Sequence, residues 1–380
     1  MGHDLNADER AVHGVGRDVL EAERLKLVAE LAELDRDAEQ RLAEVAPDLL
    51  RDRKRKRDEL TRLEEAARPR FRILRLAERG VDLAKPPPAA PVLLTGDRGV
   101  PFMRSGIVAS LIAPGGTGKT YALAQLAVSI AAGTPWLGTY QPTQKGGVLL
   151  GLAEEDDDEV HRRLAQATRG LDDYRRAEVH RNLAAHGFSG QDVAFLRRNP
   201  DKNIGPAEWF STFKAELAAK GPWRAIILDP WSRWGGVDAE TDAHAATYGV
   251  RLLEELTKLE GAPAVIVAHH TRKASKGSGP ADASDARGSS AFVDGGRFTM
   301  NLGRQGNGEL LALRVTKTNG TVPGPELILA RGDGGTLRPA TPAEGAEANP
   351  TPRQGSASAA PTPSPTNGDR AAGDTSGRWS

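Results

Sequence analysis

A glycine-rich octapeptide at residues 113–120, Ala-Pro-Gly-Gly-Thr-Gly-Lys-Thr, constrains the fold of this chain more than any other feature. An apolar run at 107–112 precedes it, and an Ala- and Leu-rich run at 121–132 follows it. Strand, loop and helix in this order form a P-loop, in which glycines let backbone amides point at phosphates and the helix adds its positive end. The sequence therefore predicts a nucleotide site on a parallel α/β sheet.

Two side chains of this loop have predicted roles of their own. Lys119 should reach the β- and γ-phosphates of ATP, and the Thr120 hydroxyl should help to hold Mg²⁺. Ala113 stands where the first glycine of such loops often sits. We assign the rest of the loop and the residue after it to nucleotide binding as well: Pro114, Gly115, Gly116, Thr117, Gly118 and Tyr121.

Carboxylates follow two further apolar runs. Residues 225–228 end in Asp229, and residues 148–153 end in Glu154. In P-loop proteins ligands lie at the carboxyl edge of the sheet, so Asp229 is predicted to hold the Mg²⁺ water shell. Glu154 is the predicted base or water-positioning group near the γ-phosphate. The acids at 156–159 are interpreted as the first turn of the next helix, where negative charge suits the dipole.

A pair of histidines, His269 and His270, ends the apolar run at 265–268. Paired histidines occur in metal sites, but no third ligand follows at a useful spacing. A γ-phosphate sensor at the strand end is the other interpretation. We favour it, and we favour His270 over His269 for that role.

Composition limits the remaining function classes. Lys plus Arg and Asp plus Glu both total 51, so no global field draws the molecule to nucleic acid or membrane. The chain has no Cys, which excludes disulfides and thiolate metal sites. We find no signal peptide and no apolar run of the roughly 18 residues that a membrane helix needs, so a cytoplasmic protein without membrane contact is expected.

The chain is predicted to consist of four segments. Residues 1–84 form an N-terminal segment in which about 17–77 are rich in Leu, Ala, Glu and Arg, with apolar residues near heptad spacing, which indicates a helical hairpin or short coiled coil. Residues 85–91 form a Pro-rich linker, and residues 92–339 form the ATPase domain. Residues 340–380 contain almost no large apolar side chains and are expected to be disordered. The expected strands of the domain are 107–112, 147–152, 225–228, 264–268, 298–302 and 310–315.

The basic run at 51–57 within the first segment allows two interpretations, a solvated helix face or a phosphate-contacting patch. Trp231 and Trp234, just past Asp229, also allow two. They could stack on a base, or they could be packing anchors, and we favour packing.

Taken together, these motifs resemble the hexameric replicative helicases of the RepA type and the related RecA-like P-loop ATPases of the AAA family. The resemblance covers roughly residues 92–335 and rests on 114–120, 152–156 with 161–164, 227–229, 269–270, 287–290 with 293–297, and 316–317. It implies a RecA-like fold, with Lys119 and Thr120 at the phosphates and Mg²⁺, Glu154 as catalytic carboxylate, Asp229 as metal-side acid and His270 as sensor.

The resemblance also implies residues that act on a neighbouring subunit. Arg297 falls where RepA-type enzymes place an arginine finger, and a finger in trans implies a homo-oligomer, a ring of six. Lys317 falls where DnaB-type helicases place a trans-acting basic residue, but Asn319 replaces their nearby arginine. The other interpretation of Arg297 is a salt-bridged strand residue.

A polar segment at 273–282 follows the sensor strand. In ring helicases a loop in this region tracks single-stranded DNA, so Arg272, Lys273 and Lys276 are DNA-contact candidates. No aromatic residue is interleaved for base stacking, and a plain surface loop is the alternative.

Three functions fit this pattern. The favoured one is an ATP- and Mg²⁺-dependent DNA helicase or motor of plasmid, phage or mobile-element replication. The second is a RecA- or RadA-like recombination or regulatory ATPase without unwinding activity. The third is an adaptor with a slow ATPase switch, whose N-terminal helices recruit a primase or initiator.

Overall fold

A nine-stranded sheet forms the centre of the protein. The computed structural model describes residues 25–30, 55–60, 74–198, 203–236, 239, 242–270, 294–305, 309–321 and 323–348. Within them the strand order is β14-β13-β12-β11-β3-β10-β9-β5-β6. Their bounds are β3 (Val108–Ala113), β5 (Gly147–Leu152), β6 (Leu183–Gly187), β9 (Trp223–Asp229), β10 (Ala264–His270), β11 (Phe298–Gln305), β12 (Leu310–Thr318), β13 (Leu327–Arg331) and β14 (Leu337–Pro339).

The sheet is mostly parallel. The six strands from β11 to β6 run parallel to one another, and β12, β13 and β14 are added antiparallel at one edge. The predicted RecA-like α/β fold is confirmed. Each of the six expected strands is present, with bounds that shift by a few residues, while β6, β13 and β14 were not expected.

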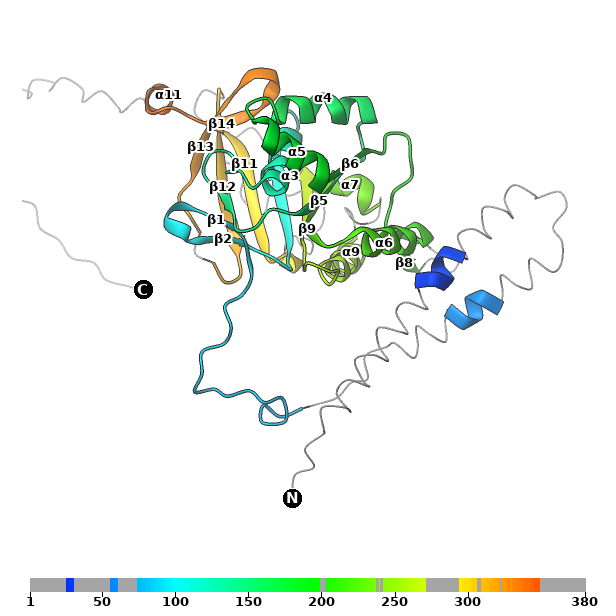
Figure 1. The fold of residues 1–380 in the computed structure, drawn as a ribbon. Coiled ribbons are helices and arrows are strands. Elements are labelled where there is room, and N and C mark those ends of the chain that lie inside the picture. The colour runs from blue at the N-terminus through cyan, green and yellow to red at the C-terminus, as the bar shows by residue number, and fades with distance from the viewer. Residues whose placement is uncertain are drawn as a thin grey trace, which may run out of the picture.

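Helices cover both faces of the sheet (Figure 1). One face carries α3 (Lys119–Ala132), α4 (Asp157–Ala167) and α5 (Asp173–Asn182). The other carries α6 (Glu208–Lys220), the short α7 (Trp231–Trp234) and α9 (Ala243–Leu256). Because successive strand residues point to opposite faces, β3 supplies Ala109 and Leu111 to the first core and Val108 to the second. This double burial explains why the parallel strands read as continuous apolar runs.

Aspartates cap the starts of three helices, α4, α5 and α9. Asp156 accepts a hydrogen bond from the Glu159 amide at 2.7 Å and caps α4, and Asp172 and Asp242 cap α5 and α9 in the same way. The acids after Glu155 therefore form a helix start, as the sequence indicated.

Two smaller sheets lie beside the large one. β1 (Val92–Thr95) pairs with β2 (Pro101–Arg104) and with β4 (Gln141–Pro142), and β7 (Leu196–Arg198) pairs with β8 (Ile204–Pro206). Behind β7, Trp231 and Trp234 are fully buried among aromatic side chains that include Phe195 and Phe213. The packing interpretation of the two tryptophans is confirmed.

The predicted disorder after residue 340 is wrong for its first residues. Pro342–Ala348 forms α11, because Thr341 and Glu344 make reciprocal hydrogen bonds at its start. Arg338 also pairs with Glu344 and, as the main cause, lowers the pKa of that carboxyl to about 2. The sequence reading missed this helix because it weighed apolar content rather than capping. Residues 349–380 lie outside the described part.

Only pieces of the N-terminal segment are described. Residues 25–30 and 55–60 are helical, and Lys56 forms an ion pair with Glu30 between them. Arg57 reaches Glu208 at the start of α6, with 3.2 Å between nitrogen and oxygen. The proposed boundaries of the four segments stay a prediction. None of the described helices is both long and apolar enough to cross a bilayer.

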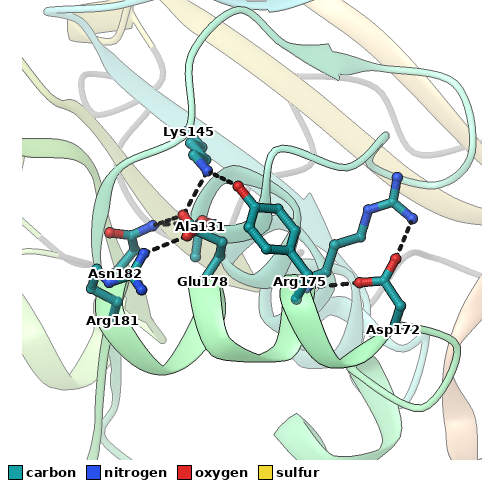
Figure 2. A network of polar contacts seen from close by, with 8 residues as sticks. Ala131, Lys145, Asp172, Arg175, Glu178, Arg181 and Asn182 are labelled. Carbon is teal, nitrogen blue, oxygen red and sulfur yellow. Dashed lines mark hydrogen bonds and ion pairs between the residues drawn. The ribbon is translucent and has the colours of Figure 1, made fainter.

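A polar network holds α5 against the end of α3 (Figure 2). The Glu178 side chain is only 6% exposed, and its carboxylate pairs with Lys145 at 2.8 Å and with Arg181. Asn182 donates to the Ala131 carbonyl of α3 at 2.9 Å, and Lys145 donates to the Tyr174 hydroxyl at the same distance. The network therefore joins α5 to α3 and to the loop that precedes β5.

We expect Glu178→Gln to lower the free energy of unfolding. Lys145 first, and Arg181 after it, lower the pKa of Glu178, so folding favours the charged carboxylate. This stabilisation is fully present above pH 4.5, the ordinary pKa, and is lost as the pH falls through the folded pKa. Urea unfolding of both proteins should show a larger difference at about pH 7 than at about pH 3. Asp173→Asn, which removes an exposed pair with Arg176, is the control. An equal loss at both pH values would contradict the electrostatic origin.

Candidate nucleotide-binding site

The P-loop connects β3 to α3 and has the backbone shape of a phosphate cradle. Gly116 and Gly118 have φ values of 74° and 96°, a region that side chains with a Cβ rarely adopt. The Thr117 hydroxyl donates to the Pro114 carbonyl at 2.6 Å and holds the turn. Because α3 begins at Lys119, directly after this loop, the positive end of the helix dipole lies beside it. The loop and helix together can bind an anion such as a triphosphate.

Lys119 lies beside His270 at this edge. Its side chain is nearly buried, and its Nζ is 3.3 Å from His270 Nδ1 and 3.5 Å from Nε2. The contact arises because β10 pairs directly with β3, which sets His270 opposite Ala113. His269 is 2% exposed, and its Nδ1 lies 3.0 Å from the His270 carbonyl oxygen. Of the two histidines, the structure therefore brings only His270 to the P-loop lysine.

Asp229 lies at the end of β9, next to β10, and contacts the start of α3. The Thr120 hydroxyl donates to Asp229 Oδ2 at 2.6 Å. Burial raises the pKa of the Asp229 carboxyl, an effect that nearby Lys119 and the Thr120 hydrogen bond oppose. A hydroxyl and a carboxylate both offer the hard oxygen atoms that Mg²⁺ prefers. In nucleotide sites Mg²⁺ usually takes one or two protein oxygens, and phosphate and water oxygens complete its coordination shell. These two residues fit a nucleotide-bound Mg²⁺.

Glu154 follows β5, the next strand along. Ala153 donates its amide to the Asp229 carbonyl at 2.8 Å, so the ends of β5 and β9 are joined. The Glu154 side chain is 50% exposed, and its Oε1 lies 3.7 Å from Arg233 Nε. Glu155, by contrast, binds Arg163 of α4 at 2.5 Å. Of the two adjacent glutamates, Glu154 is the more exposed, at 50% against 23% for Glu155, and its charge raises the pKa of Asp229.

Sequence reasoning missed one cation at the P-loop. Arg331, at the end of β13, donates from Nη2 to the Gly116 carbonyl at 2.8 Å. The β13–β14 hairpin is held there by Gln125 of α3, whose amide makes two hydrogen bonds of 2.8 Å with the Leu337 backbone. No sequence spacing signals this contact, because it depends on an antiparallel extension folding back over α3.

Arg297 and Lys317 lie at the opposite end of the sheet. The Arg297 amide donates to the Val108 carbonyl at the start of β3, whereas the P-loop follows the end of that strand. The position of Val108 and the start of the P-loop at Ala113 are five residues apart along β3, which corresponds to about 17 Å at the usual rise per residue. Lys317 donates to the Asp294 carbonyl at 2.6 Å, and burial lowers its pKa, with Arg297 adding to this effect. Neither cation is brought to the P-loop of its own chain.

The predicted DNA contacts cannot be placed. Arg272, Lys273 and Lys276 lie in residues 271–293, outside the described part of the chain.

A P-loop on the central strand, a buried acid two strands away and a second carboxylate on the next strand form the arrangement expected of a RecA-like P-loop ATPase. Comparison with known families agrees. Residues 67–276, which are 210 of the 380 residues, match the family model described as AAA domain, and the chain belongs to that family. A solved structure of a DnaB-like replicative helicase, studied with its interactions with primase, is similar at 15% identity and a TM-score of 0.45. The match covers 62% of this chain and 58% of that one.

We expect Arg331→Ala to weaken ATP binding without unfolding the protein. The substitution removes a charged donor from the P-loop carbonyl of Gly116, and an exposed contact of this kind corresponds to a loss of about three- to tenfold in affinity. Titration with a fluorescent ATP analogue would measure it. Arg338→Ala, on the neighbouring strand and paired with Glu344, is the control. Unchanged affinity in Arg331→Ala would remove this residue from the site.

Proposed function

We propose that this protein is an ATP- and Mg²⁺-dependent motor ATPase of the RepA or DnaB type that assembles into a ring and acts on single-stranded DNA during plasmid, phage or mobile-element replication. The observation that carries the proposal is the division of the charged groups between the two ends of one sheet. Lys119, Thr120, Asp229 and Glu154 gather at the carboxyl edge, while Arg297 lies at the other end. A site with one half at each end of a subunit is completed by head-to-tail assembly.

Hydrolysis would use the residues at the carboxyl ends of the strands, each in a separate role. The P-loop amides and Lys119 would bind the phosphates, and Thr120 with Asp229 would hold Mg²⁺, which would neutralise phosphate charge. Glu154 accepts a hydrogen bond from the attacking water and orients it in line with the γ-phosphate. His270, beside Lys119, would register whether the γ-phosphate is present.

The cation that the transition state still needs would come from the next subunit. Phosphoryl transfer builds charge on the γ-oxygens, and a donor placed there in trans lowers the barrier. Arg297 is the proposed donor and Lys317 its neighbour. Hydrolysis would then depend on assembly, which suits a motor that works as a ring of six.

The remaining segments would supply the partners. We assign residues 92–339 to the ATPase and Arg272, Lys273 and Lys276 to single-stranded DNA contacts. The N-terminal helices, of which 25–30 and 55–60 are described, would contact a primase or initiator.

Glu154→Gln should separate binding from hydrolysis. It keeps the size of the side chain but removes the base, so turnover should fall by about 10²- to 10⁴-fold while ATP still binds. Lys119→Ala should lose both binding and turnover. ATPase assays with and without single-stranded DNA, with nucleotide titrations, would measure these effects. Turnover of wild type that single-stranded DNA neither stimulates nor alters would contradict the motor function, and stimulation without strand displacement would favour an ATPase that does not unwind.

Mixing two inactive variants should restore activity if Arg297 acts in trans. Arg297→Ala subunits keep Glu154, and Glu154→Gln subunits keep Arg297. A complete site therefore forms wherever a Glu154→Gln subunit supplies its Arg297 to the ATP site of a neighbouring Arg297→Ala subunit. An equal random mixture has complete sites at about a quarter of its interfaces. Turnover of the mixture near that fraction of wild type, against near-zero turnover of each variant alone, is expected. Full activity of Arg297→Ala alone would exclude the finger role.

A further inference from the structure

A cavity of about 780 Å³ lies directly beside Glu154. Its wall consists of residues that follow the carboxyl ends of β5, β9 and β6, which include Glu154 itself, Ser232 and Arg233, and the segment 189–198. Ligands of open parallel sheets bind outside this edge. Its volume is in the range of cavities that hold small organic ligands, so it can take a nucleotide unit rather than a lone ion. Glu154 thus borders two spaces, the nucleotide site and this cavity.

The cavity is lined by more positive than negative charge. Arg197, Arg198 and Arg233 line it, against the carboxylates of Glu154 and Asp192, which leaves a net charge of +1 in a chain whose net charge is zero. Arg197 pairs with Asp192, and both side chains are more than half exposed. An incoming phosphate group can replace a carboxylate at an arginine of this kind, because both present paired oxygens to the planar guanidinium.

The Arg233–Glu154 pair connects this cavity to hydrolysis. The two side chains are 64% and 50% exposed with 3.7 Å between nitrogen and oxygen, and exposed pairs of this geometry contribute little to stability. The pair can therefore exchange at low cost. Glu154 and Arg233 both line the cavity, so the pair lies at its wall. A carboxylate that is held by Arg233 is less free to orient a water at the γ-phosphate.

We propose that this cavity binds the phosphate backbone of single-stranded DNA through Arg233, Arg197 and Arg198, and that the bound phosphate takes Arg233 from Glu154 and so frees the carboxylate for hydrolysis. Arg233 is then a positioning residue that couples DNA occupancy to turnover. The inference rests on the proposed function, and it names the surface and the contact through which DNA stimulates that same site.

The first test is the turnover of Arg233→Ala without DNA. Since the variant no longer holds Glu154, its kcat should rise about two- to fivefold, the factor that an exposed ion pair supplies, with an unchanged KM for ATP. Added single-stranded DNA should stimulate it less than it stimulates wild type. Arg233→Lys, which keeps the charge, should return toward wild type. Arg175→Ala, which breaks a similarly exposed pair with Asp172 on α5, is the matched control and should leave kcat and stimulation unchanged.

The second test measures the occupant of the cavity. Binding of an oligothymidylate to Arg233→Ala and Arg197→Ala should be weaker, and each lost phosphate contact should reduce the slope of log affinity against log salt by about 0.7. Inorganic phosphate at the same phosphate concentration should not raise wild-type turnover. If it does so as strongly as the oligonucleotide, the cavity binds free anions and the assignment to DNA is wrong.

The outcomes separate this inference from the function it rests on. Unchanged or reduced kcat of a folded Arg233→Ala protein, as judged by its circular dichroism and melting temperature, would overturn the release of Glu154. If DNA neither binds wild type nor stimulates it, the proposed function fails, and the DNA half of this inference fails with it. The rise in kcat of Arg233→Ala without DNA would still report whether Arg233 restrains Glu154.

Discussion

The hydrogen bond between the Thr120 hydroxyl and Asp229 is the contact on which the site depends. It joins the first turn of α3 to the end of β9 across β10, so it fixes the P-loop helix against the sheet. It also helps a buried carboxylate to remain charged, because burial and, to a smaller extent, the Glu154 charge raise the pKa of Asp229, whereas Lys119, the Thr120 hydrogen bond and His270 lower it. An unbalanced buried acid costs stability, and such groups are retained where a ligand uses them. A bound cation would offset that cost.

Strands that are buried on both faces were the predictable part of this fold. The runs that end in Ala113, Asp229 and His270 are almost entirely apolar, with Ser110 as the polar exception in the first, and a parallel sheet covered by helices on both faces buries such runs. Since parallel strands end at one edge, the polar residues after them had to meet there. The positions of Lys119, Asp229 and Glu154 at one edge follow from that rule alone. Their catalytic roles stay predictions.

The parts that were missed are those whose residues carry no such constraint. The strand β6 reads Leu-Ala-Ala-His-Gly, and none of its residues is fully buried, so neither period nor apolar content marks it. Arg331 is exposed on an antiparallel extension, and its contact with Gly116 depends on Gln125 holding Leu337 far along the chain. The Arg233–Glu154 pair likewise joins the loops after two strands. Such contacts join segments that are far apart along the chain. No fixed spacing in the sequence marks them, so they become visible only in the three-dimensional structure.

The arrangement of charge along the strands bears on how an assembly of these subunits would be controlled. The carboxyl ends of the strands carry the nucleotide groups and the cavity, and the opposite ends carry Arg297 and Lys317. The pKa of Lys317 is lowered, first by burial and then by the charge of Arg297. Head-to-tail stacking would bring the opposite ends of the strands in one subunit to the carboxyl ends in the next. Each ATP site would then answer to two inputs at different ends: the neighbour through Arg297, and DNA through Arg233. The two inputs would act on different steps, because one would supply charge to the transition state and the other would free the carboxylate proposed to orient water. Hydrolysis would be fastest in a subunit that is both assembled and occupied by DNA.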